Sequence, residues 1–231
     1  MRILVLSGSD IKGGAAKVAF ELARGLNEQG VSCDMLVQKK SGDAPWVTEI
    51  QMPERGEQPI SRRVIHRLGL NALNLNSPFP RCYGRKFFEQ YDLIHLHDLP
   101  GHFNFRHLSW LSRLRPTFWT LHTQWAFTGG CLYTYSCERH LQHCGSCPQF
   151  GQFPLHWLHR DGSREQNYLK RHVYGRSQLT PICVSTWLAE TAKAGMLGRF
   201  DVQTVLNPVD TREFFPIPKA EAKKQLGIPE D

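Results

Sequence analysis

The sequence of 231 residues has no long apolar segment. Its apolar N-terminal run, Met1 to Leu6, ends in Ser-Gly-Ser-Asp, so it is too short for a secretory signal and no cleavage site follows it. Residues 116–137 are uncharged, but a proline, a histidine, two adjacent glycines and several threonines argue against a membrane-spanning helix. We therefore expect a cytoplasmic protein whose seven cysteines form no disulfides.

Strong compositional bias and internal repeats are also absent. With 41% hydrophobic and 21% charged residues, the composition excludes collagen-like, low-complexity and wholly disordered chains. The length is sufficient for a sizeable core, and it fits one large domain or one domain followed by part of a second.

Acidic residues are fewer than basic ones: 21 Asp and Glu stand against 28 Lys and Arg, which gives a formal net charge of +7. Such a balance favours anionic partners, namely nucleic acid, an acidic membrane face or a phosphorylated substrate. Residues 54–86 alone hold seven basic and two acidic side chains, and residues 61–70 have the pattern of a basic amphipathic helix. The favoured interpretation is a solvated helix face; the alternative is a patch that contacts acidic lipid or a phosphorylated, lipid-linked substrate.

Short apolar runs alternate with amphipathic segments along the whole chain, and this alternation predicts a doubly wound α/β fold with a mostly parallel, Rossmann-like sheet. The first unit has a buried strand, a helix with Val18, Ala19, Leu22 and Leu26 on one face, and a second strand after Gly30. The predicted strands span residues 2–6, 31–37, 46–50, 92–97, 117–122, 178–184 and 202–206, and the predicted helices span 15–29, 61–70, 107–114 and 186–194, with a further helical pattern starting at residue 219.

Ligands of open parallel sheets bind beyond the carboxyl ends of the strands, so the segments just after each strand are candidate sites. Gly13 and Gly14 stand directly before the first helix. Without side chains there, the backbone can approach a ligand closely, and the helix N-terminus attracts a phosphate. The sequence contains neither Gly-x-Gly-x-x-Gly nor a Gly-Lys-Ser/Thr loop. A ligand-binding loop and a plain tight turn therefore both remain open.

His95, His97 and Asp98 lie at the end of a predicted strand. Alternate residues of a strand share a face, so the two imidazoles could bind a metal ion together. No later Asp-His or His-x-x-x-His cluster completes such a ligand set. We therefore favour buried structural histidines, or a substrate contact from His97 at the strand end.

The most specific feature is a cluster of four cysteines, Cys131, Cys137, Cys144 and Cys147, in the pattern Cys-x5-Cys-x6-Cys-x2-Cys. Four thiols within 17 residues are the right number for a tetrahedral, structural zinc ion that would staple a long loop and leave no open position for catalysis. A disulfide-tied loop and unligated thiols are the alternatives. Only Arg139 is basic between the first and last cysteine, so we expect no nucleic acid partner.

Several of these segments together resemble a known family. The runs Arg2-Ile-Leu-Val-Leu-Ser7, Asp92-Leu-Ile-His-Leu-His97 and Val205-Leu-Asn-Pro-Val-Asp210 are similar to the acceptor-side, N-terminal domain of GT-B fold glycosyltransferases of family 4. More narrowly, Thr120-Leu-His-Thr-Gln-Trp-Ala-Phe-Thr-Gly-Gly-Cys131, followed by Cys144-Gly-Ser-Cys-Pro-Gln149, resembles a subgroup of exopolysaccharide biosynthesis, including colanic-acid-like pathways. The resemblance covers nearly the whole chain.

The resemblance implies transfer of a sugar from a nucleotide-sugar donor to a glycan or lipid-linked acceptor, with retention of anomeric configuration. It places the glycine loop near the donor diphosphate and the acceptor. It also implies that His122 lines the cleft as the catalytic candidate, with Gly13, Gly14, His97, Thr123 and Trp125 as candidate substrate-binding residues. Two departures from the family pattern stand out: Thr123 where many relatives have Asp, and Asn207-Pro208 where the hinge commonly has Asn-Gly.

In the family, a C-terminal domain holds the nucleotide and carries a Glu-x7-Glu motif. We therefore expect residues 1–206 to form the acceptor-side domain, with 131–147 as its cysteine-rich loop, and 207–231 to form the hinge and the start of the next domain. The partners implied are that C-terminal domain, in cis or in trans, the acceptor, and an anionic membrane surface on the inner face. The chain alone is expected to have little or no activity. The alternative function is a non-catalytic, zinc-stabilised module that binds nucleic acid or a partner protein.

Overall fold

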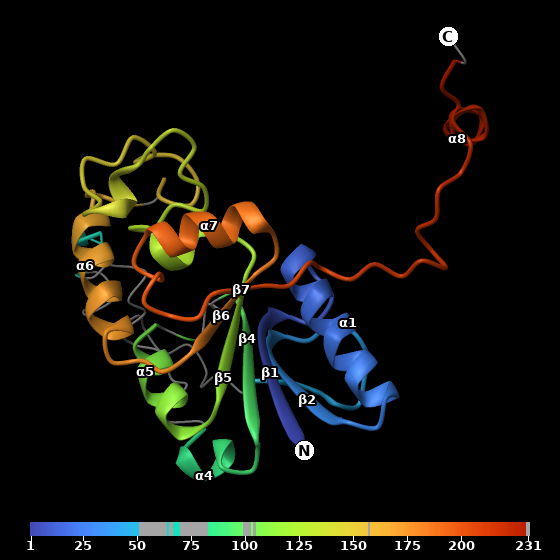
Figure 1. The fold of residues 1–231 in the computed structure, drawn as a ribbon, viewed down its shortest axis with the longest axis horizontal. Helices are drawn as coiled ribbons and strands as arrows, with labels where there is room; N and C mark the ends of the chain where they lie inside the picture. The colour runs from blue at the N-terminus through green and yellow to red at the C-terminus, as the bar shows by residue number, and fades with distance from the viewer. Residues whose placement is uncertain are drawn as a thin grey trace.

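The computed structural model describes residues 1–50, 64, 67–69, 83–98, 103, 105–156 and 158–229. Seven strands form one sheet in the order β3-β2-β1-β4-β5-β6-β7, and every neighbouring pair is parallel (Figure 1). The predicted doubly wound, Rossmann-like fold is therefore confirmed. The strands are β1 (Arg2–Ser9), β2 (Ser32–Lys39), β3 (Val47–Glu49), β4 (Leu93–His97), β5 (Thr117–Leu121), β6 (Thr180–Cys183) and β7 (Gln203–Thr204).

Helices α1, α4, α5, α6 and α7 lie in crossovers between consecutive parallel strands, and α8 follows the last strand. Two of them, α4 and α6, occupy segments for which the sequence predicted no helix, and two short 3-10 helices follow β5. The helical elements are α1 (Gly14–Glu28), α4 (Arg85–Phe88), α5 (Phe105–Leu114), η2 (Gln124–Phe127), η3 (Arg139–Leu141), α6 (Ser163–Tyr174), α7 (Thr186–Ala194) and α8 (Lys219–Leu226).

Strand β1 shows how alternate residues build the two faces of the sheet. Ile3 and Val5 are buried in a cluster with Ala19 of α1. Leu4 and Leu6 are buried in a larger cluster that includes side chains from α4, α5, α6 and α7. Successive strand side chains point to opposite faces, and both faces are covered, which explains why β1 is apolar without interruption.

Between β5 and α6 the chain makes a long excursion, residues 122–162, which contains the four clustered cysteines. This segment, yellow-green to yellow in Figure 1, lies above α6 and next to α7, at the end of the sheet towards which the strands point. The four cysteines therefore lie in a loop region beside the carboxyl ends of the strands, and the bounds 131–147 of the predicted cysteine-rich loop stay a prediction.

Helix α6 buries a polar face. Ser163, Gln166, Asn167 and Lys170 are buried together with Tyr174. Buried polar side chains are nearly always hydrogen-bonded. Lys170 and Asn167 donate to atoms of the 122–162 segment, whereas Gln166 donates to the carbonyl oxygen of Gly69.

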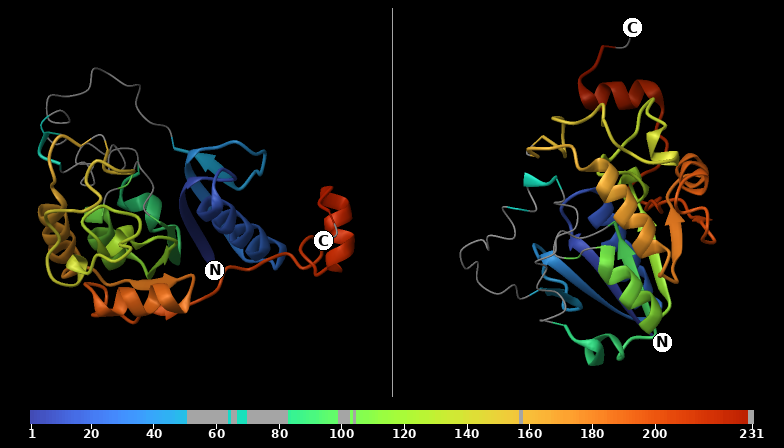
Figure 2. Two further views of the ribbon diagram at one scale, coloured as in Figure 1. Left: turned by 90° about the horizontal axis from the view of Figure 1, so that it is seen from above. Right: turned by 90° about the vertical axis from the view of Figure 1, so that its left-hand side faces the viewer.

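After β7 the chain leaves the body of the molecule. No residue from 203 to 229 is buried, and α8 stands away from the sheet in each view (Figure 2). The division into a domain of residues 1–206 and a following segment 207–231 stays a prediction.

The predicted basic helix over 61–70 lies mostly outside the described residues, as does most of the basic stretch 54–86. The predicted contact with an acidic membrane therefore stays a prediction. Among the helices that the structure does describe, none has the length and apolar character needed to cross a membrane.

Candidate functional site

The carboxyl ends of the parallel strands meet at one edge of the sheet, where most of the predicted site residues lie. Gly13 and Gly14 follow β1, His97 ends β4, and His122 follows β5. Strand β1 has β2 on one side and β4 on the other, so the strand order reverses between β1 and β4. Ligands of open α/β sheets bind at such a switch point. The structure thus brings the predicted glycine loop and histidines to the same edge.

Gly13 is the residue at which the loop after β1 turns into α1. Its φ of 95° is a conformation that residues with side chains rarely adopt. The N-cap makes no side-chain hydrogen bond, and the first turn of α1 has no acidic residue. The N-terminal N–H groups and the positive end of the helix dipole are therefore suited to an anion such as a phosphate. A Cβ atom at Gly13 or Gly14 would meet nothing within 4 Å, so this backbone faces open space.

Asp10 holds the loop that carries Gly13, and the sequence analysis missed it. Its carboxylate is fully buried and accepts the backbone N–H groups of Ile11 at 2.9 Å, Ser41 at 2.9 Å and Gly42 at 2.7 Å. Burial raises the pKa of Asp10, but these N–H groups outweigh burial and leave the pKa below its usual value. The ionised carboxylate therefore ties the end of β1 to the loop after β2.

Three imidazoles and a carboxylate gather at the ends of β4 and β5, in the cluster of His95, His97, Asp98 and His122 that we call the histidine cluster. The Nδ1 atom of His97 lies 3.2 Å from Nε2 of His122, and the two rings meet edge to edge, with centroids 5.4 Å apart and planes inclined by 29°. The centroid of the His95 ring lies 4.6 Å from that of His97, and His95 Nε2 lies 2.8 Å from Thr120 Oγ1. The strands β4 and β5 set this arrangement, because their register pairs His97 with Thr120.

Burial keeps these imidazoles neutral near pH 7. Burial, together with the smaller effect of neighbouring imidazoles, lowers the pKa of His95 to about 4 and that of His97 well below 6.5. Burial also lowers the pKa of His122, although the charge of Asp98 opposes it. A neutral imidazole offers one N–H donor and one acceptor. His97 is buried, whereas His95 and His122 are both partly exposed. Of these two imidazoles, His122 is the one that lies beyond the end of its strand, where ligands of open parallel sheets bind.

Asp98 fixes the backbone on which His122 stands. Its Oδ1 atom accepts the backbone N–H of His122 at 3.0 Å, and its carbonyl oxygen accepts Trp119 Nε1 at 2.6 Å. Burial raises the pKa of Asp98, while the bond from the His122 backbone and the nearby imidazole lower it. The φ of Asp98 is 49°, in the left-handed region that few residues other than glycine occupy. These bonds hold the turn after β4 in that conformation.

Thr123 and Trp125 lie in the turn after His122. Thr123 caps η2, because its Oγ1 accepts the backbone N–H of Trp125 at 3.4 Å. The amine of Lys170 lies 3.5 Å from the centroid of the Trp125 ring, so it covers one face of the indole. Their predicted substrate-binding roles stay predictions.

Lys170 of α6 is a fully buried amine that the sequence analysis also missed. Its Nζ donates to the carbonyl oxygens of Trp125 at 2.5 Å and Thr128 at 3.1 Å. Burial lowers its pKa to about 7, although the nearby Cys131 and Cys144 raise it. One side chain of α6 thus holds the start of the segment that follows His122.

The four clustered cysteines line one cavity, together with His140 of η3. All four are free thiols. Burial raises the pKa of Cys131 to about 11 and also raises the pKa of Cys144 and Cys147.

The zinc prediction for Cys131, Cys137, Cys144 and Cys147 is not supported. Within the described residues, no group of three or more His, Cys, Asp or Glu side chains is placed so that it could hold a metal ion. The cysteines line the cavity wall without forming such a group, and the sulfur of Cys144 instead accepts the Asn167 amide at 3.6 Å.

Polar contacts from α6 and its surroundings order the loop where a metal was expected to do so. Arg171 donates to the carbonyl oxygens of His140 and Leu141, each at 3.1 Å. The carboxylate of Asp161 accepts the backbone N–H of Cys147 at 2.7 Å. With the two bonds that Lys170 donates, these contacts satisfy loop backbone groups that would otherwise lack partners.

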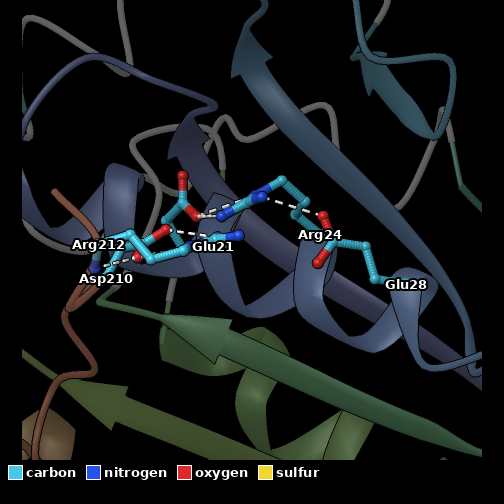
Figure 3. A network of polar contacts seen from close by, with 5 residues as sticks. All are labelled: Glu21, Arg24, Glu28, Asp210 and Arg212. Atoms are coloured by element: carbon cyan, nitrogen blue, oxygen red, sulfur yellow. Dashed lines mark hydrogen bonds and ion pairs between the residues drawn. The ribbon is translucent and has the colours of Figure 1, made fainter.

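The predicted hinge segment lies against α1 (Figure 3). On the helix, Arg24 donates to both Glu21 and Glu28, and beside them Arg212 pairs with Asp210 at 2.7 Å. Hydrogen bonds from Arg212 lower the pKa of Asp210 to about 2, and the charge of Arg24 contributes to this lowering. The ion pairs lie within α1 and within the segment after β7, and between the two elements longer-range charge effects act, such as that of Glu28 on Arg212.

A family model described as Glycosyltransferase Family 4 matches residues 12–213, which is most of the chain. The chain belongs to glycosyltransferase family 4. The matched region contains the glycine loop, the histidine cluster and the cysteine-rich segment. The family resemblance that the sequence motifs indicated is thereby confirmed.

A protein of Escherichia coli K12 named as a colanic acid biosynthesis glycosyl transferase, WcaC, is 26% identical over 171 residues. That alignment covers 67% of this chain and 41% of the WcaC protein, so the chain spans well under two thirds of this relative's length. The crystal structure of Anabaena Alr3699/HepE in complex with UDP-glucose matches 98% of this chain and 50% of that one, with 16% identity and a TM-score of 0.46. At that similarity the match carries no weight for function.

Proposed function

We propose that this chain is the acceptor-side half of a retaining glycosyltransferase, which moves a sugar from a nucleotide-sugar to a glycan or lipid-linked acceptor in polysaccharide biosynthesis. Membership of glycosyltransferase family 4 over residues 12–213 supports the reaction class. The similarity to a protein named for colanic acid biosynthesis supports the pathway class.

The observation that carries the proposal is the meeting of the glycine loop and the histidine cluster at the switch point of the sheet. The N-terminus of α1 offers N–H groups and positive potential to the diphosphate, whose charge grows as it leaves. His122 offers a neutral imidazole beside it, at the edge of β5, where it contacts the donor sugar. Gly13 and Gly14 let the substrate approach the backbone, and His97, Thr123 and Trp125 border the same region.

Sugar transfer also requires groups that hold the nucleotide opposite this edge, because donor and acceptor must be oriented together before they react. In our proposal a second, C-terminal domain supplies those groups, in cis or in trans, and residues 207–231 form the hinge towards it. The 231 residues alone then transfer sugar weakly or not at all. The protein acts in the cytoplasm, at the inner face of an anionic membrane where lipid-linked acceptors lie.

The experiment is a sugar-transfer assay of the enzyme with its second domain, using labelled nucleotide-sugars and membrane lipid extracts as acceptors. We expect His122→Ala to lower kcat by about 100-fold, because it removes a polar contact made to the reacting groups. The matched control is His159→Ala, since His159 is exposed in the cysteine-rich segment and should keep full activity. Full activity of the His122→Ala enzyme, or transfer by the 231-residue chain at the rate of the two-domain enzyme, would refute the proposal.

A further inference from the structure

His97 makes one hydrogen bond in the histidine cluster, and it makes it to His122. The two ring nitrogens, His97 Nδ1 and His122 Nε2, are 3.2 Å apart, so one of them must carry the hydrogen. The other nitrogen of His97, Nε2, is buried and has no hydrogen-bond partner within the described residues. The residue His97 is 3% exposed, so bulk water does not supply a partner for this nitrogen.

Two arrangements of the shared hydrogen can be compared. If His122 donates from Nε2, the neutral ring of His97 must carry its own hydrogen on the buried Nε2, which leaves an N–H donor without an acceptor. If His97 donates from Nδ1, its buried Nε2 is an unprotonated nitrogen that lacks only a donor. Buried N–H groups without partners are rarer than under-satisfied acceptors, so the second arrangement is favoured.

The residues next to His97 and His122 do not change which of the two arrangements is favoured. His95 uses its Nε2 with Thr120 Oγ1 at 2.8 Å, and Asp98 Oδ1 is bound by the backbone N–H of His122. The structure gives no hydrogen-bond partner to His122 Nδ1 among the described residues, and His122 is partly exposed. Nδ1 is thus the nitrogen of His122 that is left for a ligand.

We propose that His97 is a positioning residue, which donates its Nδ1–H to Nε2 of His122 and so fixes His122 in the form that carries its hydrogen on Nδ1. His122 then meets the substrate as a hydrogen-bond donor, and the group it takes is an oxygen with a free lone pair, a sugar hydroxyl or a phosphoryl oxygen. The nature of that ligand rests on the proposed function, whereas the bond between the two rings does not.

The test is NMR of the 231-residue chain with 15N-labelled histidine, near neutral pH, which reports on each imidazole which nitrogen carries the hydrogen. We expect His122 to show a protonated Nδ1 and an unprotonated Nε2. In His97→Leu this pattern should shift towards the Nε2–H form, the commoner form of a free imidazole. His97→Asn, whose amide N–H can take the place of the Nδ1–H group, should restore the wild-type pattern.

His95→Leu is the matched control, because His95 lies on the same strand and next to His97 but makes no bond to His122. It should leave the hydrogen of His122 on Nδ1, and the unfolding midpoint of every variant identifies any that has lost its fold. A wild-type His122 that carries its hydrogen on Nε2, or an unchanged pattern in a folded His97→Leu, would overturn the proposal.

In the two-domain enzyme, His97→Leu should lower kcat by about 10-fold with little change in KM, as loss of a supporting residue typically does. His97→Asn should recover most of that loss, which a purely structural role for the ring would not predict. The NMR pattern needs no turnover, so its failure rejects the role of His97 alone. The expected NMR pattern in an enzyme that transfers no sugar would instead reject the proposed function.

Discussion

Among single residues, Lys170 connects the core of the protein to the turn that follows His122. Its amine satisfies the carbonyl oxygens of Trp125 and Thr128 and lies over an indole ring, all inside the protein. A neutral amine has two hydrogens, enough for both carbonyl groups, so the site does not require the charged form. The low pKa of this lysine therefore makes stability depend on pH.

Between pH 7 and 9, we expect the free energy of unfolding of the wild type, measured relative to that of Lys170→Met, to rise by about 2 kcal/mol. The folded pKa of about 7 lies below the ordinary value of 10.5, so the unfolded chain binds more protons in this range and the wild type gains stability as pH rises. Denaturant unfolding at several pH values measures the difference. Lys193→Met, which changes an exposed lysine on α7, should show no such trend. A difference that is constant with pH would contradict the prediction.

Among the elements, α6 shows where sequence patterns fail. The runs that became β1, β2, β4 and β5 were predicted from apolar residues, and the observed strands match them closely. Helix α6 was missed because four of its five buried residues are polar, so no apolar stripe marks the buried face. The four-residue helix α4 was too short to show a period.

The candidate site was predictable only where its residues follow strands that the sequence pattern reveals. Gly13, His97 and His122 could be found because topology alone places strand ends together. Asp10 and Lys170 could not, since their roles depend on backbone groups distant in the sequence, such as Gly42 for Asp10 and Trp125 for Lys170. The cysteine spacing predicted a zinc site that the arrangement of the thiols does not support, because spacing gives the number of ligands but not their convergence.

At the same level, Gly129→Ala should destabilise the fold by about 2 kcal/mol or more, because overpacking forces backbone shifts. A Cβ atom there would lie 2.3 Å from the carbonyl oxygen of Ser163, where the cysteine-rich segment meets α6. Gly25→Ala in α1 is the matched control: its Cβ meets nothing within 4 Å, and alanine should stabilise the helix by about 0.5–1 kcal/mol. Thermal unfolding measures the midpoint of each variant. Equal midpoints for Gly129→Ala and Gly25→Ala would refute the close packing of Gly129.

For the whole molecule, buried neutral histidines predict sensitivity to acid. The pKa values of His95 and His107 are lowered by burial to about 4, so between pH 6.5 and 4 the unfolded chain binds protons that the folded chain does not. Each of these histidines should cost about 2 kcal/mol of stability between pH 7 and 5. The pKa of Asp98 is raised, so protonation of this carboxylate as the pH falls favours the folded chain and opposes the effect of the histidines. Replacing His95 by Gln should flatten the measured pH dependence, and an unchanged slope would contradict the prediction.

The segment after β7 should contribute little to the stability of the 231-residue chain. Leu226 of α8 is 72% exposed, whereas Leu197, close to the sheet in the main core, is fully buried. We expect Leu226→Ala to change the free energy of unfolding by less than about 0.5 kcal/mol and Leu197→Ala to lower it by about 3 kcal/mol. A loss above about 1 kcal/mol for Leu226→Ala would mean that this segment packs on the body.

The margins of the sheet have a consequence for association. Strand β3 has three residues and β7 has two, while the central strand β1 has eight. A sheet that narrows in this way presents few unsatisfied backbone groups at either border, and short borders are a common protection against pairing with another chain. Concentrated protein should therefore resist fibre formation through its sheet, and any self-association that is seen should involve other surfaces.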